Sequence, residues 1–205
     1  TDAVIDGRVD NALALIRPPG HHSFADRGEG FCLFADLSIA VAALRDQGRL
    51  KNGDRVAVID LDAHRGNGIA QIHREDPDVR IFDMFNCRTY PRDKESVGRI
   101  DCPIPLEPGT DDDEYLLQLQ RKLPTFLDQH GPFALAIYNA GTDIDISTLN
   151  FGGAGSVANK TTVLVTEFPS GVRNFVFAVE TQPPFGHVVA ALTTPPIGAS
   201  NLVTE

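Results

Sequence analysis

The 205-residue sequence contains no tryptophan, one methionine and three cysteines, and no apolar run approaches the roughly 18–20 residues of a membrane span. Cys32, Cys87 and Cys102 are too widely spaced for a disulfide framework or a zinc ribbon. Basic residues are also scarce, since 18 Lys and Arg face 28 Asp and Glu and give a net charge of -10. This balance argues against direct nucleic-acid binding. It is compatible with basic partners such as lysine-rich tails, or is simply that of a soluble acidic protein. With no visible signal peptide, we expect a cytoplasmic or nuclear protein without a membrane span.

The first 150 residues alternate strand and helix patterns. Strands are predicted at 12–16, 55–61, 79–84 and 134–139, and a short helix at 68–74. Asp36 is predicted to cap a helix that Gly48 ends. Thr110 is predicted to cap a long helix, with Asp113 at the capping-box position, and Pro124 to kink or split that helix. This alternation predicts a parallel α/β sheet with flanking helices.

The last part of the chain has a different character. A Gly-rich stretch at 152–156 precedes three apparent strands, near 161–166, 174–179 and 188–192, with Pro/Gly-rich turns and no helix pattern between them. We therefore divide the chain into a domain at 1–150 and a divergent β-rich segment at 151–205.

Polar side chains follow the second strand. Side chains alternate between the two faces of a strand, so Asp60, Asp62 and His64 are predicted to share a face with Val56 and Val58. Ligands of open α/β sheets bind at the carboxyl ends of strands. The cluster is either a divalent-cation site, for which Asp and His suit zinc, or a solvated strand end.

Two further motifs contain candidate functional residues. His21 and His22 follow the rigid stretch Arg17-Pro18-Pro19-Gly20, and are either metal ligands, general acid–base groups or surface residues without a role. Asp143 follows the fourth strand in Asn-Ala-Gly-Thr-Asp, as either a metal ligand or a turn residue.

Taken together, these motifs resemble the zinc-dependent superfamily of histone deacetylases and acetylpolyamine amidohydrolases. The ordered set is Arg-Pro-Pro-Gly-His-His, Gly-Phe-Cys at 30–32, Asp-Leu-Asp-Ala-His-Arg-Gly-Asn-Gly at 60–68, and Asn-Ala-Gly-Thr-Asp at 139–143. Three stretches are most similar to the class IV branch. They are Ile-Asp-Leu-Asp-Ala-His-x-Gly-Asn-Gly at 59–68, Gly109–Tyr115 and Tyr138–Asp143. The resemblance runs from about Val9 to Asp143 and implies an arginase/deacetylase-type α/β fold.

The resemblance also implies a role for each motif residue. Asp62, His64 and Asp143 match the zinc ligands, and His21 and His22 match the tandem histidines that move protons. Asp60 and Asn67 match the partners of the first and second histidine. Gly30 and Phe31 match one wall of an acyl-lysine tunnel, and Tyr90 is predicted as the opposing aromatic wall.

Three departures from the family pattern are visible. The chain begins almost at the His-His motif, so we expect an N-terminally truncated domain. The family's oxyanion-binding Tyr after the last zinc ligand has no counterpart, because Tyr90, Tyr115 and Tyr138 all precede Asp143; His187 is a conceivable substitute. The family's acidic segment after the last ligand is replaced by residues 146–152.

Three hypotheses follow. The first is zinc-dependent hydrolysis of acyl-lysine in proteins such as histone tails, with acetylpolyamines and other small acylated amines as alternative substrates. The second is a catalytically impaired binding module that keeps the pocket without turnover. The third is a chain that does not fold stably, because its sheet would lack an opening strand.

Overall fold

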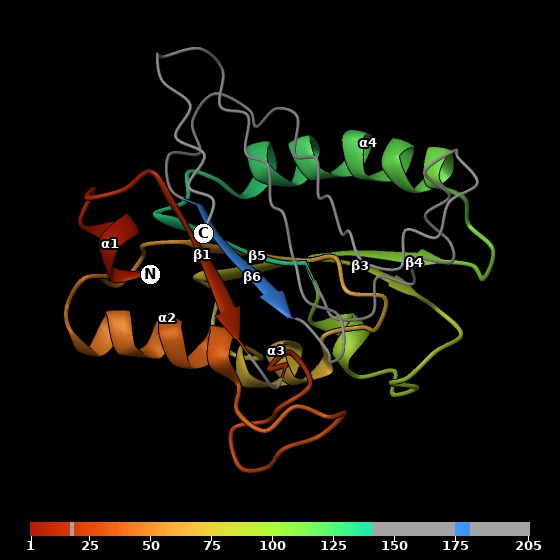
Figure 1. The fold of residues 1–205 in the computed structure, drawn as a ribbon, viewed down its shortest axis with the longest axis horizontal. Coiled ribbons are helices and arrows are strands. Elements are labelled where there is room, and N and C mark those ends of the chain that lie inside the picture. Colours follow the sequence, from red (N-terminus) through yellow and green to blue (C-terminus); the bar gives the residue numbers. More distant parts are fainter. Residues whose placement is uncertain (17–18, 141–174, 181–205) are drawn as a thin grey trace.

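The computed structural model describes residues 1–16, 19–140 and 175–180. These residues form a six-stranded sheet in the order β1-β6-β5-β2-β3-β4, in which every neighbouring pair is parallel (Figure 1). The strands are β1 (Asn11–Ile16), β2 (Val56–Asp60), β3 (Val79–Asn86), β4 (Cys102–Leu106), β5 (Leu135–Asn139) and β6 (Phe175–Glu180). The helices are α1 (Asp2–Ile5), α2 (Asp36–Asp46), α3 (Asn67–Ile72) and α4 (Asp112–His130), with the 3-10 turn η1 (Ser96–Gly98). The predicted parallel α/β sheet with flanking helices is confirmed.

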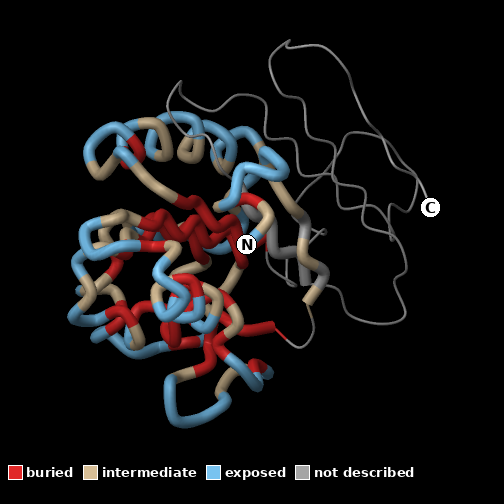
Figure 2. Tube along the Cα trace, turned by 90° about the vertical axis from the view of Figure 1, so that its left-hand side faces the viewer, coloured by how far each residue is buried: buried red, intermediate tan, exposed pale blue. Residues whose placement is uncertain are grey.

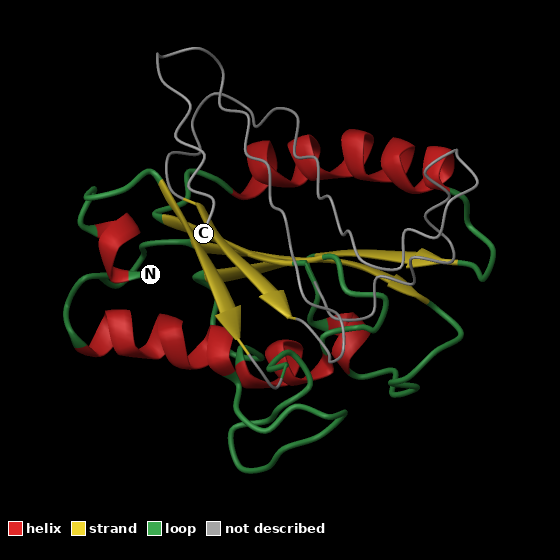
Figure 3. Ribbon diagram, viewed as in Figure 1, coloured by secondary structure: helices red, strands yellow, loops and turns green. Residues whose placement is uncertain are grey.

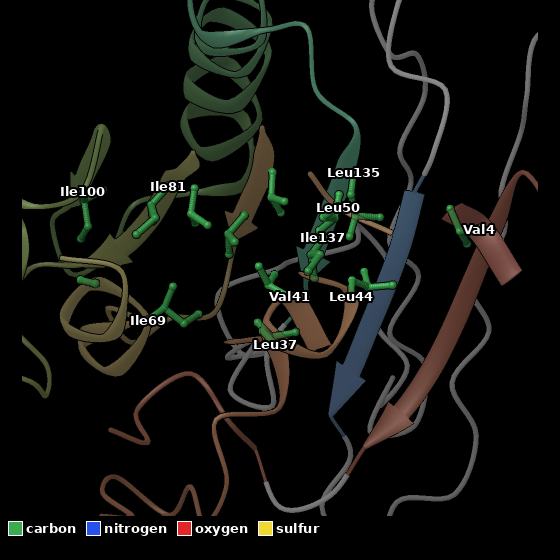
Figure 4. Packing of buried hydrophobic residues seen from close by; sticks show 14 residues of the cluster. Val4, Leu37, Val41, Leu44, Leu50, Ile69, Ile81, Ile100, Leu135 and Ile137 are labelled. Atoms are coloured by element: carbon green, nitrogen blue, oxygen red, sulfur yellow. The ribbon is translucent and has the colours of Figure 1, made fainter. Parts of the chain in front are cut away.

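The helices cover the sheet on two sides and produce two apolar cores. Helices α1, α2 and α3 lie on one face and α4 lies on the other, as Figure 3 shows. Alternation along β2 divides its side chains between the cores, because Val56 and Val58 pack toward α2 and α3 while Ala57 and Ile59 pack toward α4. Figure 4 shows the first core around Val41 and Ile69. The buried strands inside the exposed helix surfaces are visible in Figure 2.

The ends and course of two helices differ from the sequence predictions. Helix α2 is capped by Ala35, and Asp36 is its first helical residue. Helix α4 is capped by Asp111, not Thr110, because the side chain of Asp111 accepts a hydrogen bond from the Glu114 amide at 2.9 Å. Pro124 does not split α4, which runs unbroken to His130. None of the described helices combines the length and apolar character needed to cross a membrane.

Two strands show what the sequence patterns missed or placed only in part. Strand β4 was not predicted, because its Cys-Pro-Ile-Pro-Leu sequence contains two prolines; the sheet accommodates them because β4 is an edge strand. Strand β6 confirms the strand predicted near 174–179 and lies between β1 and β5. The strands predicted near 161–166 and 188–192 lie outside the described residues.

Candidate active site

A row of three polar side chains crosses the carboxyl edge of the sheet. Asp60, the last residue of β2, is in register with Asp83 of β3 and with Asn139 of β5. All three are completely buried, and Asn139 Nδ2 donates to Oδ1 of Asp60 at 3.0 Å. The row lies on the face of Val56 and Val58, at the position where parallel α/β sheets bind ligands.

The loop after β2 places Asp62 and His64 next to this row. Strand β2 ends at Asp60, so the predicted continuation of strand alternation to His64 is wrong. Hydrogen bonds between side chains and the backbone amides two residues later hold the loop instead. The Asp62 amide donates to Oδ1 of Asp60 at 3.1 Å, and the His64 amide donates to Oδ1 of Asp62 at 2.7 Å. Asp and Asn commonly fix tight turns in this way.

His21 is hydrogen-bonded to the Asp60 carboxylate. The distance from Nδ1 of His21 to Oδ2 of Asp60 is 2.9 Å, and both side chains are buried. A carboxylate only accepts hydrogen bonds, so Nδ1 of His21 carries the proton. The other ring nitrogen, Nε2, lies 3.7 Å from Oδ1 of Asp62. One imidazole therefore connects the strand-end carboxylate to the loop carboxylate.

His22 has a neutral partner instead of a carboxylate. Its Nδ1 lies 2.7 Å from Oδ1 of Asn67, the first residue of α3. The amide oxygen accepts, so Nδ1 of His22 donates and its Nε2 keeps a lone pair. The two histidine rings lie side by side, with centroids 4.0 Å apart. The structure thus pairs His21 with Asp60 and His22 with Asn67.

Burial and neighbouring charges set the protonation states of this cluster. Burial, reinforced by the adjacent His21, lowers the pKa of His22 to about 3. Burial alone would raise the pKa of Asp62, but His21 and His64 more than offset it and hold that pKa well below its usual value. Burial and the nearby Asp60 raise the pKa of Asp83. At neutral pH, His22 is therefore a neutral base and Asp62 is an anion.

Two of the three predicted zinc ligands, Asp62 and His64, have a spacing that fits a zinc ion. Oδ1 of Asp62 lies 3.2 Å from Nδ1 of His64. Two ligand atoms of a tetrahedral zinc ion, each about 2.0–2.1 Å from the metal, lie about 3.3 Å apart, so this spacing suits a shared ion. No cluster of three metal-ligating side chains occurs among the residues described. The third predicted ligand, Asp143, lies outside that range.

The predicted tunnel residues Gly30, Phe31 and Tyr90 differ in how closely they approach His22 and in how far they are exposed. Gly30 and Phe31 form the centre of a tight turn with φ values of 55° and 65°. The ring of Tyr90 meets His22 edge-on, with centroids 4.9 Å apart. Phe31 is 92% exposed and Tyr90 is 40% exposed. Tyr90 thus lies against the proton-handling pair, while Phe31 projects from the turn.

Sequence reasoning assigned no role to several residues that the fold brings to the site. Glu29 accepts from the Tyr90 hydroxyl at 2.6 Å, and Arg65 donates to Pro91 O at 2.9 Å and to Ser96 Oγ at 2.8 Å. Asp83 accepts from the Gly66 amide at 2.9 Å. These contacts join segments distant in sequence, so no local pattern predicts them. The sequence contained one indication of their role. Arg65 directly follows His64, and Glu29 directly precedes Gly30.

A model of the histone deacetylase domain matches residues 1–150. The chain belongs to the histone deacetylase family. It is 43% identical over 124 residues to histone deacetylase 2 of Arabidopsis thaliana, covering 60% of this chain and 31% of that protein. It is 33% identical over 144 residues to a histone deacetylase-like amidohydrolase of Pseudomonas aeruginosa, covering 66% of this chain and 37% of that protein. The chain thus spans about a third of the length of these relatives.

Solved structures give the same fold. An acetylpolyamine aminohydrolase from Burkholderia pseudomallei superposes with a TM-score of 0.62 at 23% identity, covering 88% of this chain and 53% of that one. The HDA15 HD domain superposes with a TM-score of 0.61 at 20% identity, covering 90% of this chain and 55% of that one. The predicted deacetylase-type α/β fold is therefore confirmed over part of the length of these structures.

Proposed function

We propose that this histone deacetylase family chain hydrolyses the amide bond of an N-ε-acyl-lysine. The observation that carries the proposal is the pair of adjacent, buried histidines, each held through its Nδ1 atom by its own partner, next to Asp62. In this arrangement both rings keep Nε2 on the side away from the partner, which is what proton transfer to and from a substrate requires. Membership of a deacetylase family supports the same reaction class.

Asp62, His64 and Asp143 would hold a zinc ion, as the family resemblance implies. When bound, zinc polarises the substrate carbonyl and makes water more acidic. Among the described residues, Asp62 would supply negative charge to the metal site. Asp62 is buried and anionic, and its Oδ1 lies beside the His64 ring. An anionic oxygen next to an imidazole nitrogen is a pair of ligands that zinc commonly takes.

The histidines would move the protons. Water adds to the carbonyl carbon and gives up one proton to an imidazole Nε2; the C–N bond then breaks, and the departing amine nitrogen takes a proton. The Asp60 carboxylate stabilises the imidazolium form of His21, since its Oδ2 lies 2.9 Å from Nδ1. Asn67 gives His22 no such charge, and the pKa of His22 is about 3. We therefore assign storage of the proton to His21, while His22 rests neutral with its Nε2 lone pair available to a proton.

The substrate class is part of the proposal. The substrate would be a protein such as a histone tail. Its acyl-lysine side chain would pass between the turn of Gly30 and Phe31 and the ring of Tyr90 to reach the site. Acetylpolyamines are the alternative, and similarity to a human protein named polyamine deacetylase HDAC10, 39% identical over 105 residues, covering 48% of this chain and 15% of that protein, supports keeping it. The motif at 59–68 favours the class IV branch. A cytoplasmic or nuclear location also stays a prediction.

A binding module without turnover is the second candidate. The observation that favours it concerns the tyrosines. The Tyr90 hydroxyl donates to Glu29, while Tyr115 and Tyr138 pack in the core on the α4 side of the sheet, away from the face of Asp60. None of them is placed to donate to a developing oxyanion, and loss of one such donor typically costs about 10²–10³ in turnover. His187 lies outside the described residues.

One assay separates the two candidates. The zinc-loaded chain is incubated with an acetyl-lysine peptide and, separately, with an acetylpolyamine, and amine release is measured. His21→Ala removes the proposed proton carrier, and His130→Ala at the distant end of α4 serves as a histidine control. Amine release that His21→Ala abolishes and His130→Ala preserves supports the enzyme. Equal release by parent and His21→Ala, with acyl peptide still bound, supports the binding module.

A further inference from the structure

Glu29 lies in a hydrogen-bonded turn beside the second histidine. It begins the tight turn around Gly30 and Phe31, which is closed by the Cys32 amide donating to the Glu29 carbonyl at 2.8 Å. The Sγ atom of Cys32 in turn accepts from the amide of His22 at 3.3 Å. The backbone of Glu29 is therefore tied to the backbone of His22 through one short turn.

The Glu29 carboxylate joins three separate segments of the chain. Its Oε1 accepts from the hydroxyl of Tyr90 at 2.6 Å and lies 3.4 Å from Nδ2 of Asn67. Its Oε2 lies 3.4 Å from Nε of Arg27. The side chain is 35% exposed, so the carboxylate remains at the rim of the site. It contacts two of the groups that lie against the His22 ring, since Asn67 bonds Nδ1 and Tyr90 packs edge-on.

These contacts select one orientation of the Asn67 amide. An amide has one accepting oxygen and one donating nitrogen, whereas a carboxylate only accepts. Glu29 therefore attracts Nδ2 of Asn67, which leaves Oδ1 facing His22. Against that oxygen, Nδ1 of His22 must donate. The reversed amide would place its oxygen against the carboxylate and its nitrogen against the imidazole, and so favour the opposite tautomer.

We propose that Glu29 is a positioning residue that, through Asn67 and Tyr90, holds His22 in the tautomer with the proton on Nδ1 and Nε2 free. The consequence for proton transfer depends on the proposed function; the tautomer itself does not. Partners that orient a metal-ligating imidazole typically change activity about 10-fold to 100-fold when removed, and we expect a loss of the same order for a proton-handling imidazole. A catalytically active chain should lose turnover by that factor in Glu29→Ala.

The test observes the imidazole directly. The chain is labelled with ¹⁵N-histidine, and its six histidines are distinguished by single substitutions. Long-range ¹H–¹⁵N correlations then show which ring nitrogen of His22 carries the proton. Glu29→Ala should convert a single Nδ1–H form into a mixture of tautomers, and Glu29→Gln, whose amide oxygen can still accept from Asn67 or Tyr90, should restore much of the parent spectrum. Asp26→Ala, in the same loop, removes an exposed carboxylate and should leave His22 unchanged.

Each outcome decides the proposal. Unchanged His22 signals in Glu29→Ala, with the His73 signals showing a folded chain, overturn it. A change of equal size in Asp26→Ala and Glu29→Ala also overturns it, because charge alone would then be the cause. A tautomer mixture in a chain without turnover supports the positioning role and speaks against the hydrolase. Unfolding of Glu29→Ala transfers the test to Tyr90→Phe, in which loss of the hydroxyl contact should broaden or shift His22.

Discussion

A Cβ atom on Gly30 would lie 2.5 Å from Cδ2 of His22, and the φ angle of Gly30 is 55°. The glycine that was predicted as a tunnel wall thus also provides the space in which the second histidine lies. Phe31 adopts φ of 65° in the same turn, a conformation unfavourable for a bulky residue. Gly30 adopts this left-handed backbone without strain, whereas Phe31 does not, and strain of this kind is often retained at functional sites.

Gly30→Ala should therefore be more destabilising than an ordinary glycine substitution. We expect a cost of about 1–2 kcal/mol from the positive φ, and about 1–3 kcal/mol more from displacement of the imidazole. Gly53→Ala is the matched control, since Gly53 has φ of 87° and open space where the Cβ would lie. Urea denaturation of both variants measures the difference. Equal losses in free energy of unfolding would show that His22 moves aside without cost.

Arg65 should hold the loop that carries Tyr90. Its buried guanidinium donates to Ser96 Oγ and Pro91 O, and also to the backbone oxygen of Asp93. Arg65→Ala leaves these acceptors without their donor, at a cost of about 1–3 kcal/mol for each group that stays buried. Hydrogen exchange should then quicken at residues 92–98. The control Arg92→Ala removes an exposed arginine of the same loop. Unchanged protection in Arg65→Ala would assign the loop's order to other contacts.

These contacts explain why the site was predictable only in part. Alternation along β2 identified the core face and placed Asp60 at its end, because strand periodicity is local. The orientation of Glu29 toward Tyr90 depends on residues 61 positions apart, and no pattern in the sequence encodes that distance. Strand β4 was missed because prolines argue against a strand unless its edge position is known. In α4, tertiary packing of Phe126 and Leu127 outweighs the local penalty of Pro124.

The stability of the fold should decrease below about pH 6.5, and His73 should account for part of the decrease. Its ring contacts Ser38 and Asp76, with Arg45 and Arg99 nearby, and burial lowers its pKa in the folded chain. The unfolded chain then binds more protons below the usual histidine pKa, so the free energy of unfolding falls as pH falls. One such group contributes up to about 2 kcal/mol between pH 7 and pH 5.

Urea denaturation at pH 7 and pH 5 measures this contribution. The variant His73→Gln should lose less stability over that interval than the parent chain does. Asp76, whose pKa is lowered to about 2, mainly through Arg45 and His73 acting against burial, loses its stabilising charge only at more acidic pH. Asp76 therefore contributes little between pH 7 and pH 5, and the comparison of parent with His73→Gln isolates the contribution of His73. The same pH dependence in parent and variant would place the titrating groups elsewhere.

Zinc should stabilise the chain through Asp62. A ligand that binds only the folded state adds about 2.7 kcal/mol at a free concentration about 100-fold above its Kd. We therefore expect zinc to raise the unfolding temperature of the parent chain and chelation to lower it, while Asp62→Asn should respond little. Asp128→Asn, an exposed carboxylate of α4, should behave like the parent. Elemental analysis after dialysis gives the zinc content of all three proteins. If Asp62→Asn retains as much zinc as Asp128→Asn, then Asp62 is not a ligand, and the proposed hydrolysis loses its metal centre.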